Sequence, residues 1–539
     1  MSNVTHAPVA SLHDGVGSPS PAHPSPRGGL RLRLRGAVAT HWLFGLVFLL
    51  AAALRLLTAL TYRPALEYVQ DSFDYLGNAH TLVPSVIRPA GYPFFLKVLG
   101  QTSQLAVVPV VQHLLGLATG VLVYAVVHRL GARWWLAALA AAPLLLDSYQ
   151  IYVEQFVLAE TLFTFLTVLA LAALLWSERV SPLVCVAVGV LLATAALTRT
   201  VGLAVLVPAV AYLLVRRAGV LRLACLVLSA GLVLVGYASW FKAEHGHVAL
   251  EAYSGYFLAG RVEPFAQCTG LSLPPAQQAL CDPRPVQAHD NSDWYVWNPG
   301  SPLRRPVVPA GTDRNAVAGD FARAIIRHQP GDYLRTVTGD VLHYFRVSRQ
   351  TGPQDGPVAT WRFRQTDAAP PWQPEYPPAD PYVNQWTWPG AAVIDGVIMG
   401  SHGFNDKQEA IGLDRQRAGW LAGYQRFGYT PGPLLALGFL LGLLAGVGRL
   451  RREDRRLRWA AALCATGGLL MLLTPAVSAS FDYRYILPAL PLMSAAGVLG
   501  VVLIEKRLRA RREAGRTGDG RTGDGRTGDG SVGSGSRLA

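Results

Sequence analysis

Long uncharged runs of apolar residues recur along this chain and leave few architectures open to it. Of its 539 residues, 51% are hydrophobic and only 15% are charged, whereas soluble proteins carry about 25% charged residues. Several runs reach the roughly 20 residues that a helix needs to cross a bilayer. Because lipid offers the backbone no hydrogen-bond partners, these runs are expected to be helical. The sequence therefore predicts an all-α polytopic membrane protein.

We expect about ten transmembrane helices, because short polar connections separate the apolar runs. Basic connections such as "HRLGAR", "RRAGVLR" and "RLRREDRRLR" mark the cytoplasmic side by the positive-inside rule. Both termini are then cytoplasmic, and 61–103, 147–157, 241–430 and 476–484 lie outside. Arg55, near the outer end of the first span, is expected to extend towards the interface. The expected spans lie roughly at 39–60, 104–127, 134–150, 158–176, 181–197, 200–216, 221–240, 431–448, 459–475 and 485–504.

The net charge of +14 could suggest a nucleic-acid partner, but the basic cytoplasmic connections explain it better. We therefore expect membrane lipid, and no nucleic acid, as a partner. Only four lysines accompany the many arginines, and alanine, glycine, leucine and valine are abundant. That composition is typical of a GC-rich bacterial genome and indicates the bacterial plasma membrane as the location.

The five cysteines fall into two groups. Cys185, Cys225 and Cys464 lie in apolar spans, where a cysteine usually serves as a small buried hydrophobic residue. Cys268 and Cys281 lie in a polar region expected outside the membrane, so they are either a disulfide pair or two free thiols. A disulfide closing so short a loop would stabilise the region by about 3 kcal/mol. No cysteine and histidine spacing matches a zinc site.

The segment "EYVQDSFDYLGNAHTLVPSVIRPAGYPFF" follows the first span and holds more polar chemistry than a turn needs. Asp71 and Asp74 stand three residues apart, Tyr75 follows them, and Arg88 precedes a Pro-Ala-Gly-Tyr-Pro bend. The prolines and the glycine favour a bend that returns the chain along the membrane surface. An acidic pair in such a place is often only solvated or ion-paired. The pattern alone therefore leaves its role open.

This loop, "DSFDYLGNA…RPAGYPFF", resembles the first external loop of the GT-C membrane glycosyltransferases. That family includes protein O-mannosyltransferases and the aminoarabinose transferases that modify lipid A. Its loop opens with an Asp, usually followed by Glu, with a Tyr one helical turn later. Asp71 and Tyr75 match this pattern, whereas Ser72 stands in place of the Glu. Whether Asp74 takes over part of that role stays open.

Further segments resemble GT-C motifs and follow in the expected order. "AIIRHQPGDYL" resembles a His-x-Pro-x-x-Tyr-Leu surface helix. The resemblance covers about 40–240, 320–345 and the last two spans. It implies GT-C-like juxtamembrane helices and an external α or α+β insertion. It also implies a sugar donor linked to polyprenyl phosphate, used at the outer face of the membrane. The remaining motifs are "VLAETLFTFL" with Glu160, "LTRTVGL" with Arg199, and "YRYILPALPLM" with Arg484 and Tyr485.

Transfer of a sugar from such a donor needs a base for the acceptor hydroxyl and cations for the lipid phosphate. A carboxylate within about 2.6–3.2 Å can take the hydroxyl proton, and we assign this general-base role to Asp71. Arginine suits the phosphate because its planar fork binds two oxygens at once. A single in-line displacement would invert the anomeric centre. The expected phosphate or substrate ligands are Arg88, Tyr75, Arg199, Arg484 and Tyr485, and the possible second acids are Asp74 and Glu160.

Each candidate also has a purely structural interpretation. Glu160 could pair with an arginine only to make its burial tolerable, Arg199 could reach to the interface, and Arg484 could pair with Asp482. Asp74 is better explained as a supporting residue than as the base. No cofactor is certain and the metal is unknown. A divalent ion is possible because carboxylates lie near a phosphate. His328, His343 and His402 could bind a metal or the acceptor, or could be solvated surface residues.

The apolar runs and the low-complexity ends divide the chain into five parts. The core is expected to hold about seven spans. The expected parts are a disordered cytoplasmic tail at 1–36, a transmembrane catalytic core at 37–240 with its first external loop at 61–103, an external or periplasmic region at 241–430, the last three spans at 431–510, and a disordered Gly-rich cytoplasmic tail at 511–539.

The leading hypothesis is an inverting glycosyltransferase, hexosyl or pentosyl, that moves a sugar from a polyprenyl-phosphate carrier to an unknown acceptor. The acceptor could be a protein, a lipid or a polysaccharide. A transporter or flippase of lipid-linked saccharides is the alternative, but the two halves show no convincing repeat, and the candidate charges lie at outer ends of spans. An inactive GT-C-like scaffold is a third possibility, because Ser72 replaces the usual Glu.

Overall fold

The computed structural model describes residues 26–68, 71–102, 104–298, 300–304, 312–352, 355–356, 358–366, 392–394, 397–399, 412–446 and 454–519. Helix α1 begins at Pro26 and α19 extends to Asp519, so both enter the segments expected to be tails. The rest of those tails and His402 lie outside the described residues.

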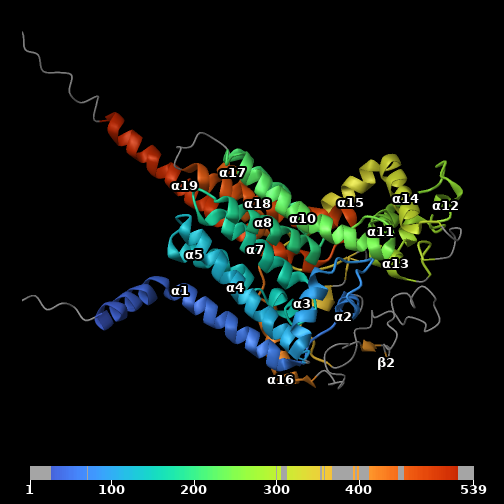
Figure 1. The fold of residues 1–539 in the computed structure, drawn as a ribbon, viewed down its shortest axis with the longest axis horizontal. Coiled ribbons are helices and arrows are strands. Elements are labelled where there is room, and N and C mark those ends of the chain that lie inside the picture. The colour runs from blue at the N-terminus through green and yellow to red at the C-terminus, as the bar shows by residue number, and fades with distance from the viewer. Residues whose placement is uncertain are drawn as a thin grey trace, which may run out of the picture.

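Apolar helices packed side by side form the body of the molecule (Figure 1). Among the described residues, five are long and apolar enough to cross a membrane, and five shorter ones accompany them. These helices correspond to the expected spans, and the prediction of a nearly all-α polytopic membrane protein is confirmed. They are α1 (Pro26–Thr61), α4 (Val107–Arg129), α5 (Trp134–Leu146), α7 (Glu160–Trp176), α8 (Pro182–Thr198), α9 (Gly202–Val215), α10 (Val220–His245), α17 (Gly432–Gly446), α18 (Arg455–Ser478) and α19 (Leu490–Asp519).

The span expected at 134–150 is shorter in the structure, because Asp147 ends it. Helix α5 stops at Leu146, and the Asp147 side chain accepts a hydrogen bond from the backbone N–H of Tyr149. Asp147 thereby caps a new short helix, α6 (Ser148–Val153), as N-terminal capping residues do. Both Asp147 carboxylate oxygens also accept hydrogen bonds from Arg349. The extended backbone of Asp147 thereby separates α6 from α5.

The expectation that Arg55 extends towards the interface is wrong. Its side chain is 2% exposed and forms an ion pair with Glu154, at 2.8 Å between Arg55 Nε and Glu154 Oε2. The guanidinium of Arg55 tolerates burial because it is paired with the opposite charge of Glu154. Sequence alone did not suggest Glu154 as its partner, because the two residues lie 99 positions apart.

Short helices lie across one end of the bundle and carry most of the predicted site residues. They are α2 (Asp71–Thr81), α3 (Gly91–Leu99), η1 (Gly100–Thr102), η4 (Val358–Trp361), η6 (Tyr483–Ala489) and α16 (Arg415–Gln425). Both aspartates of α2 lie in its first turn, where the helix dipole favours negative charge. The start of α3 touches the end of α8 so closely that a Cβ on Gly91 would lie 2.6 Å from the Leu197 carbonyl carbon.

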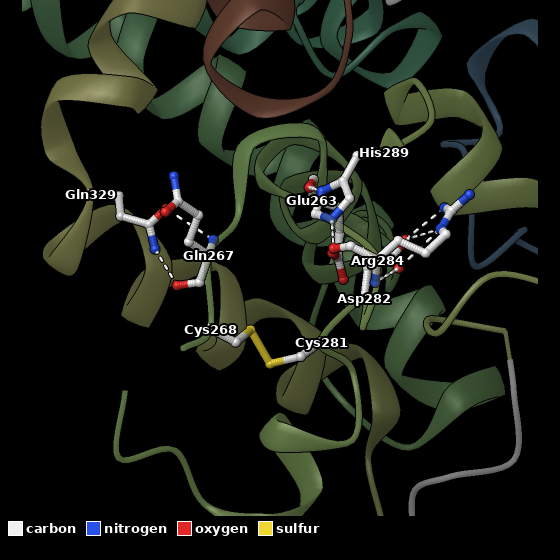
Figure 2. The surroundings of a disulfide bond; sticks show 8 residues. All are labelled: Glu263, Gln267, Cys268, Cys281, Asp282, Arg284, His289 and Gln329. Carbon is white, nitrogen blue, oxygen red and sulfur yellow. Dashed lines mark hydrogen bonds and ion pairs between the residues drawn. A yellow bond between two sulfur atoms is a disulfide. The ribbon is translucent and has the colours of Figure 1, made fainter. Parts of the chain in front are cut away.

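The region between α10 and α17 forms a smaller helical unit with its own core. Phe321, Ile325 and Tyr295 are fully buried in it. A disulfide joins Cys268 to Cys281 (Figure 2). Helices α14 and α15 meet at Pro330. The unit contains α11 (Ser254–Val262), η2 (Glu263–Phe265), α12 (Pro275–Gln278), η3 (Val286–Ala288), α13 (Ser292–Trp297), α14 (Arg314–His328) and α15 (Pro330–His343).

Strands are few and short in the described part of the chain. β1 (Tyr62–Arg63) pairs antiparallel with β4 (Gly412–Leu413), which ties the end of α1 to the segment before α16. β2 (Ala392–Ile394) pairs antiparallel with β3 (Val397–Met399). In Figure 1, the start of α1 and the end of α19 lie on one side of the bundle, and α11 to α14 lie on the opposite side.

Candidate active site

A cavity of about 210 Å³ opens at the end of the bundle that carries α2 and η6. Its walls come from α2, the link between α8 and α9, helices α11 and α13, and the end of α18. Segments that lie far apart in sequence therefore meet around one space. Six of the predicted site residues line it: Asp71, Tyr75, Arg88, Arg199, Arg484 and Tyr485.

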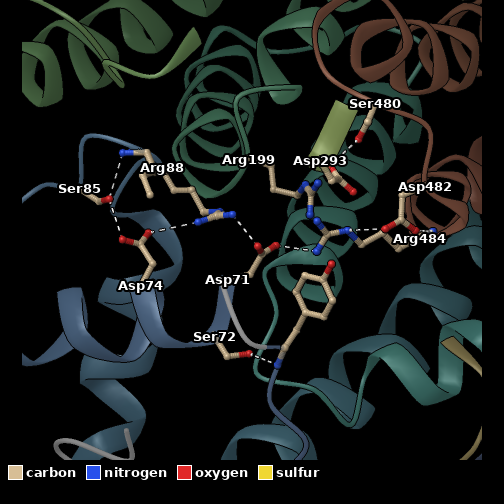
Figure 3. Close-up of polar contacts among 12 residues, drawn as sticks. Asp71, Ser72, Asp74, Ser85, Arg88, Arg199, Asp293, Ser480, Asp482 and Arg484 are labelled. Atoms are coloured by element: carbon tan, nitrogen blue, oxygen red, sulfur yellow. Dashed lines mark hydrogen bonds and ion pairs between the residues drawn. The ribbon is translucent and has the colours of Figure 1, made fainter. Parts of the chain in front are cut away.

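The Asp71 carboxylate lies between two arginines (Figure 3). Its Oδ1 is 2.5 Å from Arg88 NH2, and its Oδ2 is 2.6 Å from Arg484 NH1. Burial alone would raise the pKa of Asp71, but the attraction of Arg484 and Arg88 outweighs burial and leaves this pKa below its ordinary value. Asp71 is therefore ionised, and both of its oxygens are occupied.

Asp74 contacts Arg88 but does not line the cavity. Its Oδ1 accepts hydrogen bonds from Ser85 at 2.8 Å and from Asn78 at 3.1 Å, and its Oδ2 is 3.6 Å from Arg88 NH1. Burial raises the pKa of Asp74 despite the attraction of Arg88. These contacts hold the loop that carries Arg88.

Glu160 and Arg199 form an ion pair next to Arg484. The Glu160 side chain is buried at the start of α7, and its Oε1 contacts Arg199 NH1 and lies 3.6 Å from Arg484 NH1. Arg199 follows the last residue of α8 in an extended conformation, which directs the chain towards the cavity. Both arginines also lie over the ring of Tyr485, at 5.4 Å for Arg199 and 5.2 Å for Arg484.

Arg484 does pair with Asp482, but it also faces the cavity. Arg484 Nε lies 3.5 Å from Asp482 Oδ2, and the Arg484 backbone N–H donates to Asp482 Oδ1 at 2.8 Å. Trp361 Nε1 donates to the same Oδ1 at 2.6 Å. Burial raises the pKa of Asp482 to about 6, against the attraction of Arg484. Arg484 therefore pairs with Asp482 and also lines the cavity.

Tyr75 and Ser72 take different positions on α2. Tyr75 is buried against Tyr92, with ring centroids 4.9 Å apart, and Arg88 lies 5.6 Å over its ring. Ser72 is fully buried and is not part of the cavity wall. Its hydroxyl donates to the Val157 carbonyl at 2.9 Å and accepts from the Tyr68 backbone N–H at 2.8 Å. Ser72 is therefore a structural residue of the loop.

Sequence reasoning missed two carboxylates that the region between α10 and α17 contributes to the cavity wall, Glu251 and Asp293. Asp293 accepts a hydrogen bond from Ser480 at 3.3 Å (Figure 3). Burial raises the pKa of Asp293, against the attraction of Arg484, and burial raises the pKa of Glu251 to about 7. Neither residue belongs to a recognised motif, and each comes near Arg484 or Arg88 only through folding.

Of the candidate histidines that the structure describes, neither His328 nor His343 lines this cavity. His343 is buried, stacks on Phe481 at 4.3 Å and interacts through Nε2 with the Gln350 carbonyl. His328 is bonded through Nδ1 to the Ala324 carbonyl of its own helix. No group of three His, Cys, Asp or Glu that could hold a metal ion occurs in the described part of the chain.

Comparison with known proteins supports the resemblance drawn from the motifs. The model of the dolichyl-phosphate-mannose-protein mannosyltransferase family matches residues 103–238, which confirms the resemblance to the GT-C membrane glycosyltransferases over that segment. No curated protein matches the chain at a significant level.

Among solved structures, the chain is similar to ArnT from Cupriavidus metallidurans bound to undecaprenyl phosphate. The two are 15% identical, and the match covers 85% of this chain and 78% of ArnT with a TM-score of 0.30. A score this low does not establish a common arrangement of the helices.

Proposed function

We propose that this chain is an integral-membrane glycosyltransferase that moves a sugar from a polyprenyl-phosphate carrier to an acceptor hydroxyl. The observation that supports it best is the Asp71 carboxylate placed between Arg88 and Arg484 in one cavity. A base and cations for a phosphate are thereby brought together, which is the combination that this transfer requires.

In the proposed reaction, the acceptor oxygen attacks the anomeric carbon as the bond from that carbon to the phosphate oxygen breaks. The bonding electrons leave with the lipid phosphate, and the acceptor proton passes to Asp71. One in-line displacement inverts the anomeric centre. Arg88, Arg199 and Arg484 would stabilise the charge that develops on the phosphate, because preorganised cations act strongly in a site that excludes water.

The two ion pairs of Asp71 suggest how the base becomes available. Asp71 carries two arginines, so it is a poor base in this state. A donor phosphate brings oxygens that compete for the same guanidinium groups. Once the arginines turn to the phosphate, one Asp71 oxygen is free to accept the acceptor proton.

The two walls of the cavity suit the two halves of a sugar phosphate. The arginines lie on the wall formed by α2, the α8–α9 link and η6, and Glu251 and Asp293 lie on the wall from the outer region. Carboxyl groups accept hydrogen bonds from sugar hydroxyls. We place the phosphate at the arginines and the saccharide towards the outer region, on the outer face of the membrane.

A transferase fits the distribution of charge better than a transporter. Asp71, Arg199 and Arg484 gather in a cavity at one end of the bundle. Transporters instead place their binding sites near the bilayer midplane between repeats. The cavity therefore favours chemistry at one membrane face.

Replacing Asp71 with Asn tests the proposal in the full-length protein reconstituted in liposomes. The substrates are a panel of radiolabelled polyprenyl-phosphate hexoses and pentoses, and the readout is the release of polyprenyl phosphate in the presence of membrane extract as acceptor. Loss of the base should lower kcat by about 10²–10⁴-fold, while yield and thermal stability are retained.

Asp74→Asn is the matched control, because it removes a carboxyl group of the same helix that does not line the cavity. We expect it to lower kcat much less than Asp71→Asn. Full activity of Asp71→Asn would contradict the general-base assignment, and a wild-type protein inactive with every donor of the panel would contradict the proposed function.

A further inference from the structure

A second cluster of ionisable side chains is buried between α1, α4 and α6, outside the cavity. Arg55 donates from Nε and NH2 to both oxygens of Glu154, each at 2.8 Å. The Glu154 carboxylate also accepts from Gln150 Nε2 at 3.0 Å, and its Oε2 lies 2.9 Å from His113 Nδ1. Glu154 is fully buried, and Arg55 and His113 are nearly so.

The fit around Glu154 is tight enough to restrict the residue opposite it on α4. A Cβ placed on Gly116 would lie 2.2 Å from Glu154 Oε1. Arg55 NH1 is also used, because it donates to the Leu145 carbonyl at 2.7 Å. Side chain and backbone therefore hold the Glu154 carboxylate in one position.

Hydrogen bonds connect this cluster to the chain segment that carries Asp71. His113 Nε2 lies 3.0 Å from the Gln155 side-chain oxygen, and Gln155 Nε2 donates to the Tyr62 carbonyl at 2.6 Å. The Leu66 backbone N–H donates to the Gln155 carbonyl at 3.0 Å. The residues that follow Glu154 are therefore joined to the segment after α1.

The connection continues up to the start of α2. The Val157 backbone N–H donates to the Leu66 carbonyl at 2.9 Å, and the Val157 carbonyl accepts from the Ser72 hydroxyl at 2.9 Å. Ser72 is the neighbour of Asp71 in the first turn of α2. A continuous set of hydrogen bonds therefore runs from Gln155, the neighbour of Glu154, to Ser72, the neighbour of Asp71.

Burying this many charged and polar groups inside a membrane protein costs free energy, and such groups usually have a function. An apolar packing of similar volume would often stabilise a fold as well as a buried ion pair does. The cluster lies outside the cavity wall, so its groups do not touch the substrate of the proposed reaction. Its hydrogen bonds lead instead to the loop that presents the base.

We infer that Arg55, Glu154 and His113 are positioning residues, which fix Tyr62, Leu66 and Ser72 and thereby the Asp71 carboxylate. This inference rests on the proposed function for its catalytic consequence, but not for the mechanical link between Glu154 and Leu66.

Two variants disturb the cluster without removing its charges. In Gly116→Ala the added Cβ takes space that the Glu154 carboxylate occupies, although alanine favours the helix. In Arg55→Lys the positive charge stays, but the bidentate hydrogen bonding to the Glu154 carboxylate is lost. Gly231→Ala is the matched control, because a Cβ at this position of α10 meets no described atom within 4 Å.

Hydrogen exchange measured on the full-length protein gives a readout that does not depend on activity. We expect the amides of Leu66 and Val157 to exchange at least tenfold faster in both cluster variants than in the wild type or in Gly231→Ala. Unchanged exchange in Gly116→Ala and Arg55→Lys would overturn the inference. If one variant fails to fold, the other still decides the outcome.

Kinetics test the consequence for Asp71. Misplacement of a catalytic group by about 1 Å lowers a rate by as much as 10²-fold. We expect kcat per correctly folded molecule to fall by about 10–100-fold, with the donor KM within about threefold of wild type because the phosphate ligands stay in place. A purely structural role would lower the yield and leave kcat unchanged.

The outcomes separate this inference from the proposed function. If wild type transfers a sugar and Asp71→Asn abolishes the transfer, but both cluster variants keep their kcat, positioning is disproved. If exchange rises in the cluster variants while the wild-type protein transfers no sugar, the link between the cluster and the loop holds and the proposed function fails.

Discussion

Arg484 shows how one side chain can join separate parts of a site. Its guanidinium contacts Asp71, lies 3.6 Å from Glu160 and 3.5 Å from Asp482. It also lies 5.0 Å over the ring of Tyr68. Arginine can make all these contacts because its planar group has five donors and two faces. A lysine would keep the charge but not this arrangement.

Glu251 makes the cavity sensitive to pH. Burial raises its pKa to about 7, although Arg88 lowers it in part. Below this value the carboxyl group is neutral, and above it a negative charge faces the proposed phosphate site. We therefore expect the KM for the polyprenyl-phosphate sugar to rise as pH increases from about 6 to 8. The phosphodiester of the donor keeps one charge over this range.

Glu251→Gln checks this prediction, because its side chain stays neutral at all pH values. The KM of this variant should rise less with pH than that of the wild type, because Asp482, whose pKa burial raises to about 6, also lines the cavity and still titrates. The same raised pKa stabilises the folded state at low pH, and this contribution is lost as pH rises through 7. A wild-type KM that does not change with pH would contradict the prediction.

At the scale of single residues, local motifs indicated several residues that line the cavity. They did not indicate residues that come close to these only in the folded chain. Asp71, Arg88, Arg199 and Arg484 stand in segments that can be read one at a time. Glu154 could not be assigned from sequence, because the pattern does not show that its partner Arg55 lies 99 residues earlier. Glu251 and Asp293 were missed for the same reason.

At the scale of elements, the contact between α3 and α8 sets the distance between two predicted phosphate ligands. Arg88 lies shortly before α3, and Arg199 follows the last residue of α8. Gly91 permits the contact, because a Cβ there would lie 2.6 Å from the Leu197 carbonyl carbon and oxygen. Backbone atoms cannot move aside as a flexible side chain can.

We expect Gly91→Ala to lower the free energy of unfolding by about 1–3 kcal/mol, as overpacking does. It should also lower the affinity for the proposed donor, since Arg88 and Arg199 would move apart. Thermal unfolding and the donor KM give the two measurements. Gly339→Ala in α15, where a Cβ meets no described atom within 4 Å, should leave the donor KM unchanged and should not lower the free energy of unfolding, because alanine favours a helix.

Hydrophobic runs predicted the number and order of the apolar helices well, because burial in lipid demands long apolar segments. They predicted helix ends less well. Asp147 ends α5 through a side-chain cap, and Pro475 lies inside α18. A hydropathy pattern records neither the cap nor the proline, since both depend on backbone hydrogen bonds.

At the scale of the whole molecule, the disulfide provides a test of which side of the membrane the cavity faces. Cys268 and Cys281 lie in the unit that supplies one cavity wall. If this unit is on the outer face, a membrane-impermeant maleimide should label both thiols in intact cells after mild reduction. Cys185, Cys225 and Cys464 lie in apolar helices and should stay unlabelled.

Loss of this disulfide should also weaken the unit. The two cysteines are 13 residues apart, and closing a loop of that length contributes about 3 kcal/mol in the chain-entropy model. Cys281→Ser should therefore speed hydrogen exchange in α11 and α14 but leave α4 and α7 unchanged. Labelling of the thiols only after cell lysis would contradict the outer location.

The double ion pair of Asp71 also has a kinetic consequence for the molecule as a whole. An acceptor that arrives first finds its base occupied by Arg88 and Arg484, so binding should follow a compulsory order with the donor first. Spent polyprenyl phosphate would then compete with the donor and not with the acceptor.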